Sequence, residues 1–432
     1  MSGAPLTVSL DLALGGTGAP PKAAYEASLG AAVGALNWLR EQHSAKSLEL
    51  LGIPARTDDL KVAKARAAEI VKGCKTVAVL GIGGSSLGGQ ALTALRKTAV
   101  PFVEFHDNPD PFSWTAALKR FDLKKTHFIC ISKSGGTAET LTQALTAAEA
   151  LKKAGVKTLA KHFTIVTEPH KSAQKNVLAD FADGIGAPKL DHPTGVGGRY
   201  SVLTMVGILP ALLMGIDVKQ LRAGAAAVLE ATLAAKTPAE APAATGAALH
   251  HALAEEGKLA TTILWPYADA LAVFGGWWRQ LWAESLGKDG KGSTPVSVLG
   301  PVDQHSQLQL FRDGPGNALF TILSVDMKGL GPAVPKAAAK ALGLGYLAGK
   351  KPGDLVDAEC RATAQTLFKN GRPVRTIHVA KVDAFNMGAL MMHFMLETIL
   401  MGRLMGVDPF NQPGVEEGKV LARQYLAQGV AR

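Results

Sequence analysis

Two glycine- and serine-rich segments, each directly after a short apolar run, constrain the possible folds of this chain most. Residues 81–88 read Gly-Ile-Gly-Gly-Ser-Ser-Leu-Gly, and residues 132–140 read Ser-Lys-Ser-Gly-Gly-Thr-Ala-Glu-Thr. A helical pattern follows both segments, so each predicts a strand, a tight polar turn and a helix N-terminus. Such turns offer backbone N–H groups and hydroxyls to an anion, and the helix dipole assists. Two of them in consecutive βα units predict a shared phosphate site.

The composition indicates a globular enzyme of more than one domain. The chain has 432 residues, which exceeds the usual size of a single core. It is 47% hydrophobic and 19% charged, as is typical of a soluble globular protein. Its net charge of +10 comes from scattered lysines and arginines, without basic runs interleaved with aromatic residues. We therefore expect no nucleic-acid partner and a mildly positive field that attracts anionic metabolites.

The cysteines and the apolar stretches bear on location. The chain has three cysteines, Cys74, Cys130 and Cys360, and their spacing is not that of metal ligands, so we predict no metal site. An odd number of cysteines without a pattern also favours a reducing compartment, and we therefore expect the cytoplasm. The N-terminus lacks a basic region followed by an apolar core, so we predict no signal peptide. The apolar stretches 200–216 and 387–405 are interrupted by a proline and by charged residues, respectively. Both predict buried helices rather than membrane spans, and no membrane partner.

The order of patterns along the chain predicts the fold class and the domains. Strand-like runs alternate with helical patterns, which is typical of doubly wound parallel sheets with ligands at the carboxyl ends of the strands. We expect an α/β protein with two such flavodoxin-like domains, similar in plan, and helical N- and C-terminal extensions. Residues 1–60 are expected to cap the first domain, 61–235 to form it, and 245–432 to form the second domain with a C-terminal helix. The proline-containing stretch 236–244 is the expected linker.

The elements expected from these patterns fall into two series. In the first domain they are helix 59–72, strand 76–80, helix 86–97, strand 102–105, helix 111–120, strand 126–131, helix 137–154, strand 162–167 and a long apolar helix from about Tyr200. In the second they are strand 260–265, helix 270–286, strands 296–299 and 318–325, helix 354–369, strand 374–380, helix 385–405 and a last helix from about 415.

Two segments place ionisable residues beside helix ends. Arg199 follows two glycines at a predicted helix start, where its planar fork can face a bound anion or a developing oxyanion. Pairing with a surface carboxylate is the alternative. Glu284 stands near the end of an apolar helix, where we expect a buried acid suited to general base catalysis. It could also be a plain exposed residue before Gly287. The tryptophans of this helix are predicted to be core residues rather than a cofactor site.

Two further residues are weaker candidates when each is taken alone. His305 follows the predicted strand 296–299, at the strand's carboxyl end, where α/β active sites lie. A structural role is the simpler interpretation of a single histidine. Lys419 lies on the first turns of the final predicted helix, where a solvated lysine is the simpler interpretation.

Taken together, these segments resemble the glucose-6-phosphate isomerase family over roughly residues 60–427. Six motifs appear in that family's order: the loop at 81–88, SKSGGTAET, GGRYS, WAESLGK, DQHSQLQLF and NQPGVEEGK. The resemblance implies an aldose–ketose isomerase of glycolysis and gluconeogenesis that interconverts D-glucose 6-phosphate and D-fructose 6-phosphate through ring opening and a cis-enediolate. It also implies two sugar isomerase domains, a homodimer with sites at the subunit interface, and neither cofactor nor metal.

The same resemblance implies a role for individual residues. Arg199 lies beside the C1–C2 oxygens of the substrate, and Glu284 is the proton-transferring base. His305 and Lys419 open the sugar ring, and His305 reaches the neighbouring subunit's site. The remaining matched positions contact the substrate, most of them at its phosphate: Gly84, Ser85, Ser132, Lys133, Ser134, Thr137, Gln280 and Gln412. Ser134 stands where threonine is common, and Asn411 where aspartate is common.

Two alternatives stay open at this point. A regulatory protein that senses sugar phosphates without turnover would need the phosphate loops but not the trio of Glu284, His305 and Lys419, so their joint presence favours the enzyme. An isomerase that also accepts mannose 6-phosphate would carry the same motifs. Residues 1–60 have no part in the resemblance.

Overall fold

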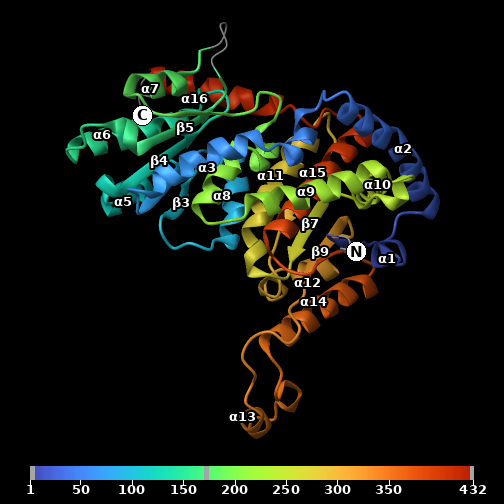
Figure 1. The fold of residues 1–432 in the computed structure, drawn as a ribbon. Coiled ribbons are helices and arrows are strands. Elements are labelled where there is room, and N and C mark those ends of the chain that lie inside the picture. The colour runs from blue at the N-terminus through green and yellow to red at the C-terminus, as the bar shows by residue number, and fades with distance from the viewer. Residues whose placement is uncertain (1–4, 170–174, 429–432) are drawn as a thin grey trace.

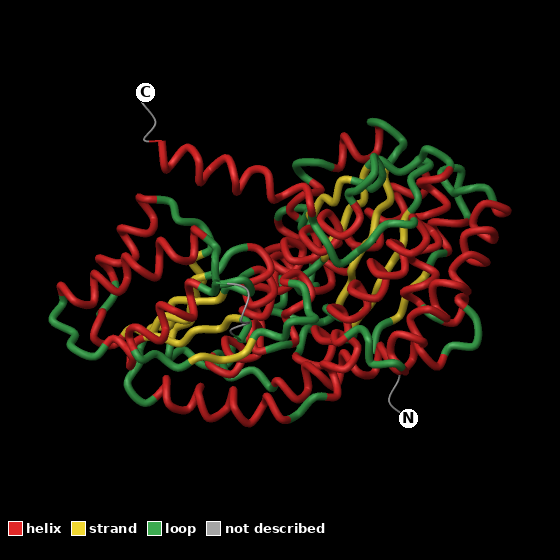
Figure 2. The backbone as a smooth tube through the Cα atoms, turned by 90° about the horizontal axis from the view of Figure 1, so that it is seen from above, coloured by secondary structure: helices red, strands yellow, loops and turns green. Residues whose placement is uncertain are grey.

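The computed structural model describes residues 5–169 and 175–428 and contains two β-sheets, each covered by helices. Figure 1 shows the two units side by side, and Figure 2, seen from above, shows their strands as two separate groups. The predicted α/β class with two parallel-sheet domains is confirmed.

The first sheet has the strand order β3-β2-β4-β5-β6, and all its pairs are parallel. In chain order its strands are β2 (Thr76–Leu80), β3 (Phe102–His106), β4 (Thr126–Ile131), β5 (Phe163–Thr167) and β6 (Lys189–Asp191). This is the order of flavodoxin-like folds, in which the strand order reverses beside the first strand. All residues of β4 and β5 are buried, which explains why both read as continuous apolar runs.

Of the helices of this unit, the first precedes β2 and the other four connect its strands, as expected for βαβ crossovers. They are α3 (Asp58–Val71), α4 (Leu87–Ala91), α5 (Pro111–Arg120), α6 (Ala138–Lys153) and α7 (Val177–Ile185). Of these, α5 matches its predicted bounds, because Asp110 accepts a hydrogen bond from the Ser113 N–H at 2.8 Å and Pro111 begins the helix.

The second sheet repeats this plan with one addition. Its order is β1-β10-β9-β7-β8, built from β7 (Thr261–Pro266), β8 (Thr294–Ser297), β9 (Ala318–Val325), β10 (Val374–Val379) and the N-terminal β1 (Thr7–Ser9). Only β1 is antiparallel, with Thr7 paired to His378. The expectation that the whole N-terminal segment caps the first domain is therefore wrong for β1, which forms the edge of the second sheet.

Most of the remaining helices pack around and between the two sheets, whereas α13 (Lys336–Ala341) lies on a projecting arm and α16 (Glu416–Gln428) buries none of its residues. The others are α1 (Asp11–Leu14), α2 (Lys22–Ser44), α8 (Met205–Leu213), α9 (Val218–Ala234), α10 (Pro242–Glu255), α11 (Ala272–Leu286), α12 (Leu308–Asp313), α14 (Pro352–Lys369) and α15 (Ala384–Met405). Within the described residues, α15 alone is long and apolar enough to cross a membrane, and 89% of its apolar window is buried inside the protein. It is a core helix, as predicted.

Three predicted elements differ clearly from the structure, and the first is helix 86–97, which is α4 followed by a 3-10 helix, Leu92–Leu95. The long helix expected from Tyr200 is a short 3-10 helix, Gly198–Leu203, followed by α8. Thr204 begins α8 as its N-cap, and its hydroxyl accepts the Val206 N–H. Gly207 allows the Val202 carbonyl to approach this turn closely, since a side chain at that position would overlap it. The stretch 236–244 is not a plain linker, since it contains the start of α10, and Ala243 and Ala244 are buried.

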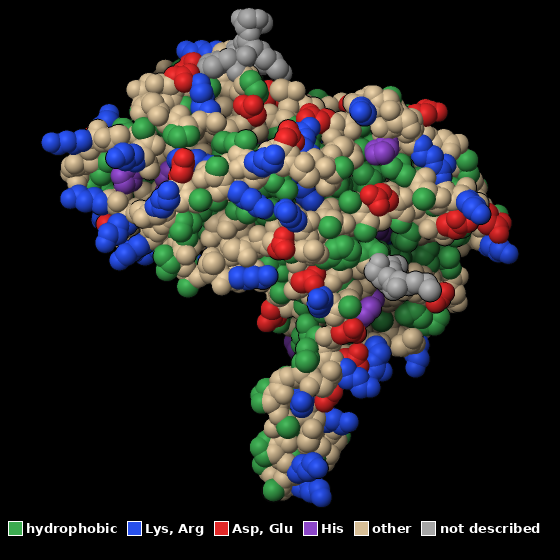
Figure 3. Space-filling view, in the orientation of Figure 1, with side chains coloured by type: hydrophobic (Ala, Val, Ile, Leu, Met, Phe, Trp, Pro, Cys, Tyr) green, Lys and Arg blue, Asp and Glu red, His purple; other side chains and the backbone are tan. Residues whose placement is uncertain are grey.

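An arm made of residues 326–352 projects from the second unit and ends in α13 (Figure 1). Its tip exposes large apolar side chains, with Leu342 74% and Tyr346 72% exposed. The space-filling view in Figure 3 shows the arm standing clear of the body, with lysine and arginine side chains among apolar ones.

Candidate active site

The first glycine-rich loop follows β2 and lies directly against two other segments. Gly83 has φ +57, and a side chain there would come within 2.8 Å of the Gln280 Nε2 atom. A side chain on Gly84 would overlap the backbone of Gly198, next to Arg199. Ser85 closes the loop and is partly buried. Glycine is therefore required at Gly84 because the loop touches the backbone of the Arg199 segment, and it is favoured at Gly83 because of the positive φ.

The second loop follows β4 and leaves a helix N-terminus open. Ser132 is buried, and its hydroxyl lies 2.8 Å from that of Thr137. Thr137 precedes α6, but its side chain does not cap the helix. The N–H groups at the start of α6 thus lack a side-chain acceptor and can receive an anion. The Ser134 hydroxyl accepts the Gly136 N–H at 3.3 Å, and the Lys133 ammonium lies 3.7 Å from Glu168.

Asn176 shapes this second loop, although no motif marks it in the sequence. Gly135 has φ +67, and a side chain there would overlap the Asn176 amide. The Asn176 Nδ2 atom donates to Thr167 Oγ1 at 3.0 Å, and its Oδ1 atom caps α7 by accepting the Ala179 N–H. A buried asparagine that makes these bonds fixes the loop against β5 and α7.

Both loops leave the same edge of the first sheet. Leu80, the last residue of β2, pairs with Cys130 of the neighbouring strand β4. Since the strands are parallel, residues 81–86 and 132–137 emerge together, beside the point where the strand order reverses. This is the arrangement predicted for a shared phosphate site.

Arg199 is buried and donates through all three of its nitrogens. Its Nε donates to Ser285 Oγ at 2.8 Å, and its Nη2 donates to the carbonyls of Pro409 and Asn411 at 2.7 and 2.9 Å. Its Nη1 donates to Gln412 Oε1 at 2.7 Å and to Glu284 Oε2 at 3.3 Å. The guanidinium is thereby fixed in one orientation beside the carboxylate.

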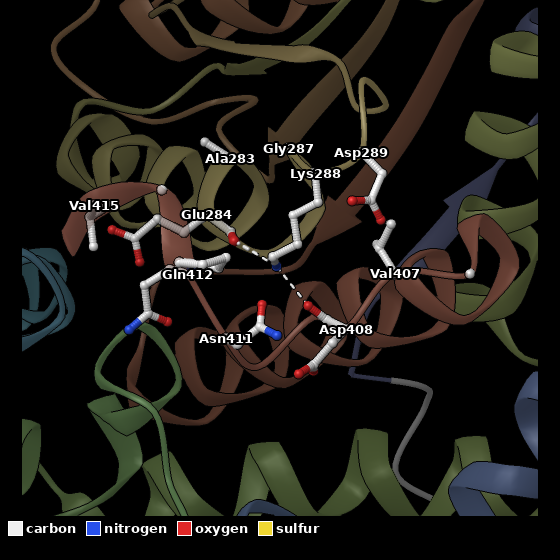
Figure 4. A pocket seen from close by; sticks show the side chains of 13 residues that line it. Ala283, Glu284, Gly287, Lys288, Asp289, Val407, Asp408, Asn411, Gln412 and Val415 are labelled. Carbon is white, nitrogen blue, oxygen red and sulfur yellow. Dashed lines mark hydrogen bonds between the residues drawn. The ribbon is translucent and has the colours of Figure 1, made fainter. Parts of the chain in front are cut away.

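Glu284 is less buried than predicted. Its side chain is 31% exposed, because the last turn of α11 faces a pocket of about 640 Å³. Figure 4 shows Glu284 and Gln412 in this pocket, which is lined by residues of α11, the loop that follows it, and the segment 406–415. The second carboxylate oxygen accepts a hydrogen bond from Gln280 Nε2 at 3.0 Å. The structure therefore brings together four of the predicted residues: Arg199, Gln280, Glu284 and Gln412.

Three buried residues support this group and were not recognised in the sequence as parts of a site. Ser285 Oγ lies 3.0 Å from the Tyr200 hydroxyl, and burial raises the pKa of Tyr200 to about 12. Trp277 Nε1 donates to the Arg199 carbonyl at 3.2 Å. The predicted core role of the tryptophans of α11 is confirmed, since all three are buried: Trp277, Trp278 and Trp282.

The N-terminal segment also reaches this region. The Gly195 N–H donates to Glu49 Oε2 at 3.0 Å, and Arg56 Nη2 donates to Glu49 Oε1 at 2.8 Å. Glu49 thus braces the loop that leads into Arg199. No motif marks Glu49, so the sequence did not reveal this contact.

His305 and Lys419 lie apart from the Glu284 group. The Asp303 carboxylate accepts the Leu299 N–H and the Ser306 hydroxyl at 2.7 and 2.6 Å, which fixes the turn and leaves His305 exposed. Lys419 lies on the exposed helix α16, 2.7 Å from Glu416. Within the described part of the chain, neither side chain has a hydrogen bond or ion pair with Arg199, Gln280 or Glu284.

Comparison with known proteins gives a consistent result. The family model described as phosphoglucose isomerase matches residues 62–309 and 336–431. A glucose-6-phosphate isomerase of Rubrobacter xylanophilus is 39% identical over 79% of this chain and 80% of the relative, and one of Carboxydothermus hydrogenoformans is 36% identical over 89% and 86%. A hypothetical protein of Thermus thermophilus aligns with a TM-score of 0.86 at 31% identity, covering 98% of this chain and 100% of that one. A glucose-6-phosphate isomerase of Chlamydia trachomatis shares the fold, with a TM-score of 0.80 at 20% identity, over 100% of this chain and 90% of that one.

Proposed function

Because this chain belongs to the phosphoglucose isomerase family, we propose that it interconverts D-glucose 6-phosphate and D-fructose 6-phosphate, in glycolysis and gluconeogenesis. The observation that carries this proposal is the group formed by Glu284, Arg199, Gln280 and Gln412 at the pocket. It combines a carboxylate open to a ligand with a fixed cation, as aldose–ketose isomerisation requires.

Glu284 is the base in this proposal. A proton on a carbon next to a carbonyl is weakly acidic, so its removal needs a positioned base and stabilisation of the enediolate that forms. Glu284 carries the proton between C2 and C1, and general base catalysis of this kind contributes about 10²–10⁴-fold. Arg199, with its other N–H groups held by fixed acceptors, places positive charge where the oxyanion develops.

The two loops of the first sheet bind the phosphate. The start of α6 supplies N–H groups, and the loop side chains supply hydroxyls and a cation: Ser85, Ser132, Lys133, Ser134 and Thr137. Gly84 allows the first loop, residues 81–86, to lie against the backbone of the Arg199 segment. Binding at the phosphate does no chemistry, but it fixes C1 and C2 against Glu284.

Ring opening is assigned to His305 and Lys419, which transfer protons at the ring oxygen and the C1 hydroxyl. His305 is exposed and separate from its own chain's Glu284 group, so we assign it to the site of a second copy in a homodimer. The exposed apolar side chains of the arm, Leu342 and Tyr346, and of α16, Tyr425 and Leu426, support a surface that a second chain covers.

Location and domain limits are part of the same proposal. The three cysteines are free and buried, as expected in the reducing cytoplasm: Cys74, Cys130 and Cys360. We assign residues 61–235 to the first domain and residues 245–432, together with β1 of the second sheet, to the second domain.

The first experiment tests turnover. Purified protein is incubated with fructose 6-phosphate, and glucose 6-phosphate and mannose 6-phosphate are measured separately. We expect glucose 6-phosphate from the parent and a loss of kcat of at least about 10²-fold in Glu284→Gln, with little change in KM. Binding of fructose 6-phosphate without turnover would instead favour the sensing protein, and release of both aldoses the broader isomerase.

The second experiment tests the shared site. His305→Ala and Glu284→Gln proteins are mixed under conditions where subunits exchange. If His305 serves the partner's site, each mixed dimer has one site with both residues intact, or about a quarter of all sites after random exchange. Activity then rises above that of either parent variant. No rise despite proven exchange would mean that both residues serve one site from the same chain.

A further inference from the structure

Lys288 joins the end of α11 to the segment that follows α15. Its ammonium donates to the carbonyls of Glu284 and Ser285 at 3.0 and 2.7 Å, and to the carbonyl of Asp408 at 2.6 Å. Figure 4 shows Lys288 inside the pocket, with hydrogen bonds to Glu284 and Asp408. An ammonium has three protons, so all of them are used. Two of the acceptors belong to the last turn of α11, where carbonyls lack partners within the helix.

The segment reached by Lys288 also orients Arg199. Asp408 is followed by Pro409 and Asn411, whose carbonyls accept both Nη2 hydrogen bonds of Arg199, and by Gln412, which accepts one from Nη1. Lys288 therefore connects the turn that carries Glu284 with the loop that aims Arg199. Arg199 itself contacts the end of α11 through Ser285 Oγ at 2.8 Å and Glu284 Oε2 at 3.3 Å, and Lys288 adds a second connection between this turn and the 408–412 segment.

The Lys288 ammonium is partly buried and lies among charged groups of the site. Burial lowers its pKa, and the neighbouring Arg199 acts in the same direction, whereas the carboxylates of Asp408, Glu284 and Asp289 oppose this. A partly buried cation among backbone carbonyls is typical of a structural clamp, because each carbonyl dipole points at the charge.

We propose that Lys288 is a positioning residue for the isomerisation, holding Glu284 and Arg199 in register by clamping the end of α11 to the 408–412 segment. The inference rests on the proposed function for its catalytic consequence, but the clamp itself is a property of the fold. Lys288 does not need to touch the substrate. Its loss should misplace the base relative to the cation, which lowers the rate far more than the affinity.

Lys291 provides a matched control. It lies in the same loop and carries the same charge, and its ammonium donates to the Met405 carbonyl at the end of α15 at 2.7 Å. It thus caps a helix in the same way, but it has no hydrogen bond to α11 or to residues 408–412 within the described part of the chain. Lys288→Met and Lys291→Met remove the same charge and differ in the clamp.

The test compares Lys288→Met, Lys288→Arg and Lys291→Met with the parent. We expect kcat to fall at least about tenfold in Lys288→Met, with KM changed less than about threefold, and partial recovery in Lys288→Arg. Lys291→Met should keep kcat near that of the parent. Equal losses in both methionine variants, or a loss that only follows the melting temperature, would overturn the proposal.

A second readout does not depend on turnover. Amide hydrogen exchange of residues 283–287 and 406–412 should be faster in Lys288→Met than in the parent, and unchanged there in Lys291→Met. Unchanged exchange in Lys288→Met would refute the clamp even if the parent is active. If exchange is faster in Lys288→Met but the parent does not turn over fructose 6-phosphate, the proposed function is refuted and the clamp remains intact. If Lys288→Met does not fold, Lys288→Arg is measured by the same two readouts.

Discussion

Replacing Arg199 by lysine tests the geometry of the site without changing its charge. The guanidinium has five N–H groups, and the structure provides five acceptors: Ser285 Oγ, Glu284 Oε2, Gln412 Oε1 and the carbonyls of Pro409 and Asn411. A lysine ammonium has only three protons, so at least two acceptors lose their donor. A hydrogen bond to a charged group contributes about 1.5–3 kcal/mol, which makes the expected loss about 3–6 kcal/mol.

This loss is divided between folding and catalysis, because Arg199 links α11 to the 408–412 segment as well as facing the substrate. If most of it appears in the transition state, kcat/KM for fructose 6-phosphate falls by about 10²–10⁴-fold. The assay couples glucose 6-phosphate formation to a dehydrogenase, and the melting temperature is measured in parallel. Arg361→Lys is the control, since Arg361 makes an exposed ion pair with Asp357 on α14.

The outcome separates charge from shape. Suppose that the kcat/KM of Arg199→Lys stays within about twofold of the control and its melting temperature within about two degrees. A point charge is then sufficient at this position. The argument that the planar fork sets the geometry of the site would then be wrong.

Three further outcomes follow from the described contacts. The double variant Ser132→Ala, Thr137→Ala lacks both members of a hydroxyl pair. We expect its affinity for fructose 6-phosphate and for inorganic phosphate, measured by calorimetry, to fall by at least about tenfold. Unchanged affinity would mean that the pair is purely structural. Gly246→Ala should lower the free energy of unfolding in urea by about 1–3 kcal/mol, because the added methyl group would clash with Arg375 and Glu397. Gly34→Ala is the control: its methyl group would lie in open space on α2, so we expect a neutral or stabilising effect. Burial lowers the pKa of both His192 and His250 to about 4. The folded-state pKa of each histidine lies below the unfolded value of about 6.5, so its contribution to the free energy of unfolding is complete above pH ~6.5 and is lost as the pH falls towards ~4. The loss is up to about 1.4 kcal/mol per pH unit for each histidine. Equal urea midpoints at pH 7 and pH 5 would contradict this.

The fold was largely predictable because burial imposes a simple pattern on parallel strands. The strands β2 and β4 are buried over nearly their whole length, and both were found at their predicted bounds. The N-terminal β1 was missed for the opposite reason. It has only three residues, and Thr7 is exposed, so nothing local marks it as a strand. Its partner β10 lies far away in the sequence, and a pairing of that kind leaves no periodic signal.

The site was predictable in its side chains but not in its backbone. The residue patterns singled out Arg199 and Glu284, and the family resemblance added Gln280 and Gln412; the structure brings all four together. The degree of burial of Glu284 could not be predicted, because it depends on how the 406–415 segment folds over the end of α11. The clamp at Lys288 was equally hidden, since all three of its acceptors are backbone carbonyls, which every sequence contains.

The difference between side chains and backbone also bears on Asn411, where the family resemblance leads us to expect aspartate. The atom of Asn411 that holds Arg199 is its backbone carbonyl, which accepts from Nη2 at 2.9 Å. The preceding acceptor, the Pro409 carbonyl, belongs to a residue whose side chain cannot accept a hydrogen bond. An exchange of aspartate for asparagine leaves both carbonyls in place and removes only a side-chain charge that borders the pocket. The orientation of Arg199 is therefore insulated from this substitution, because it depends on the path of the chain from Asp408 to Gln412, which Lys288 holds from the other side.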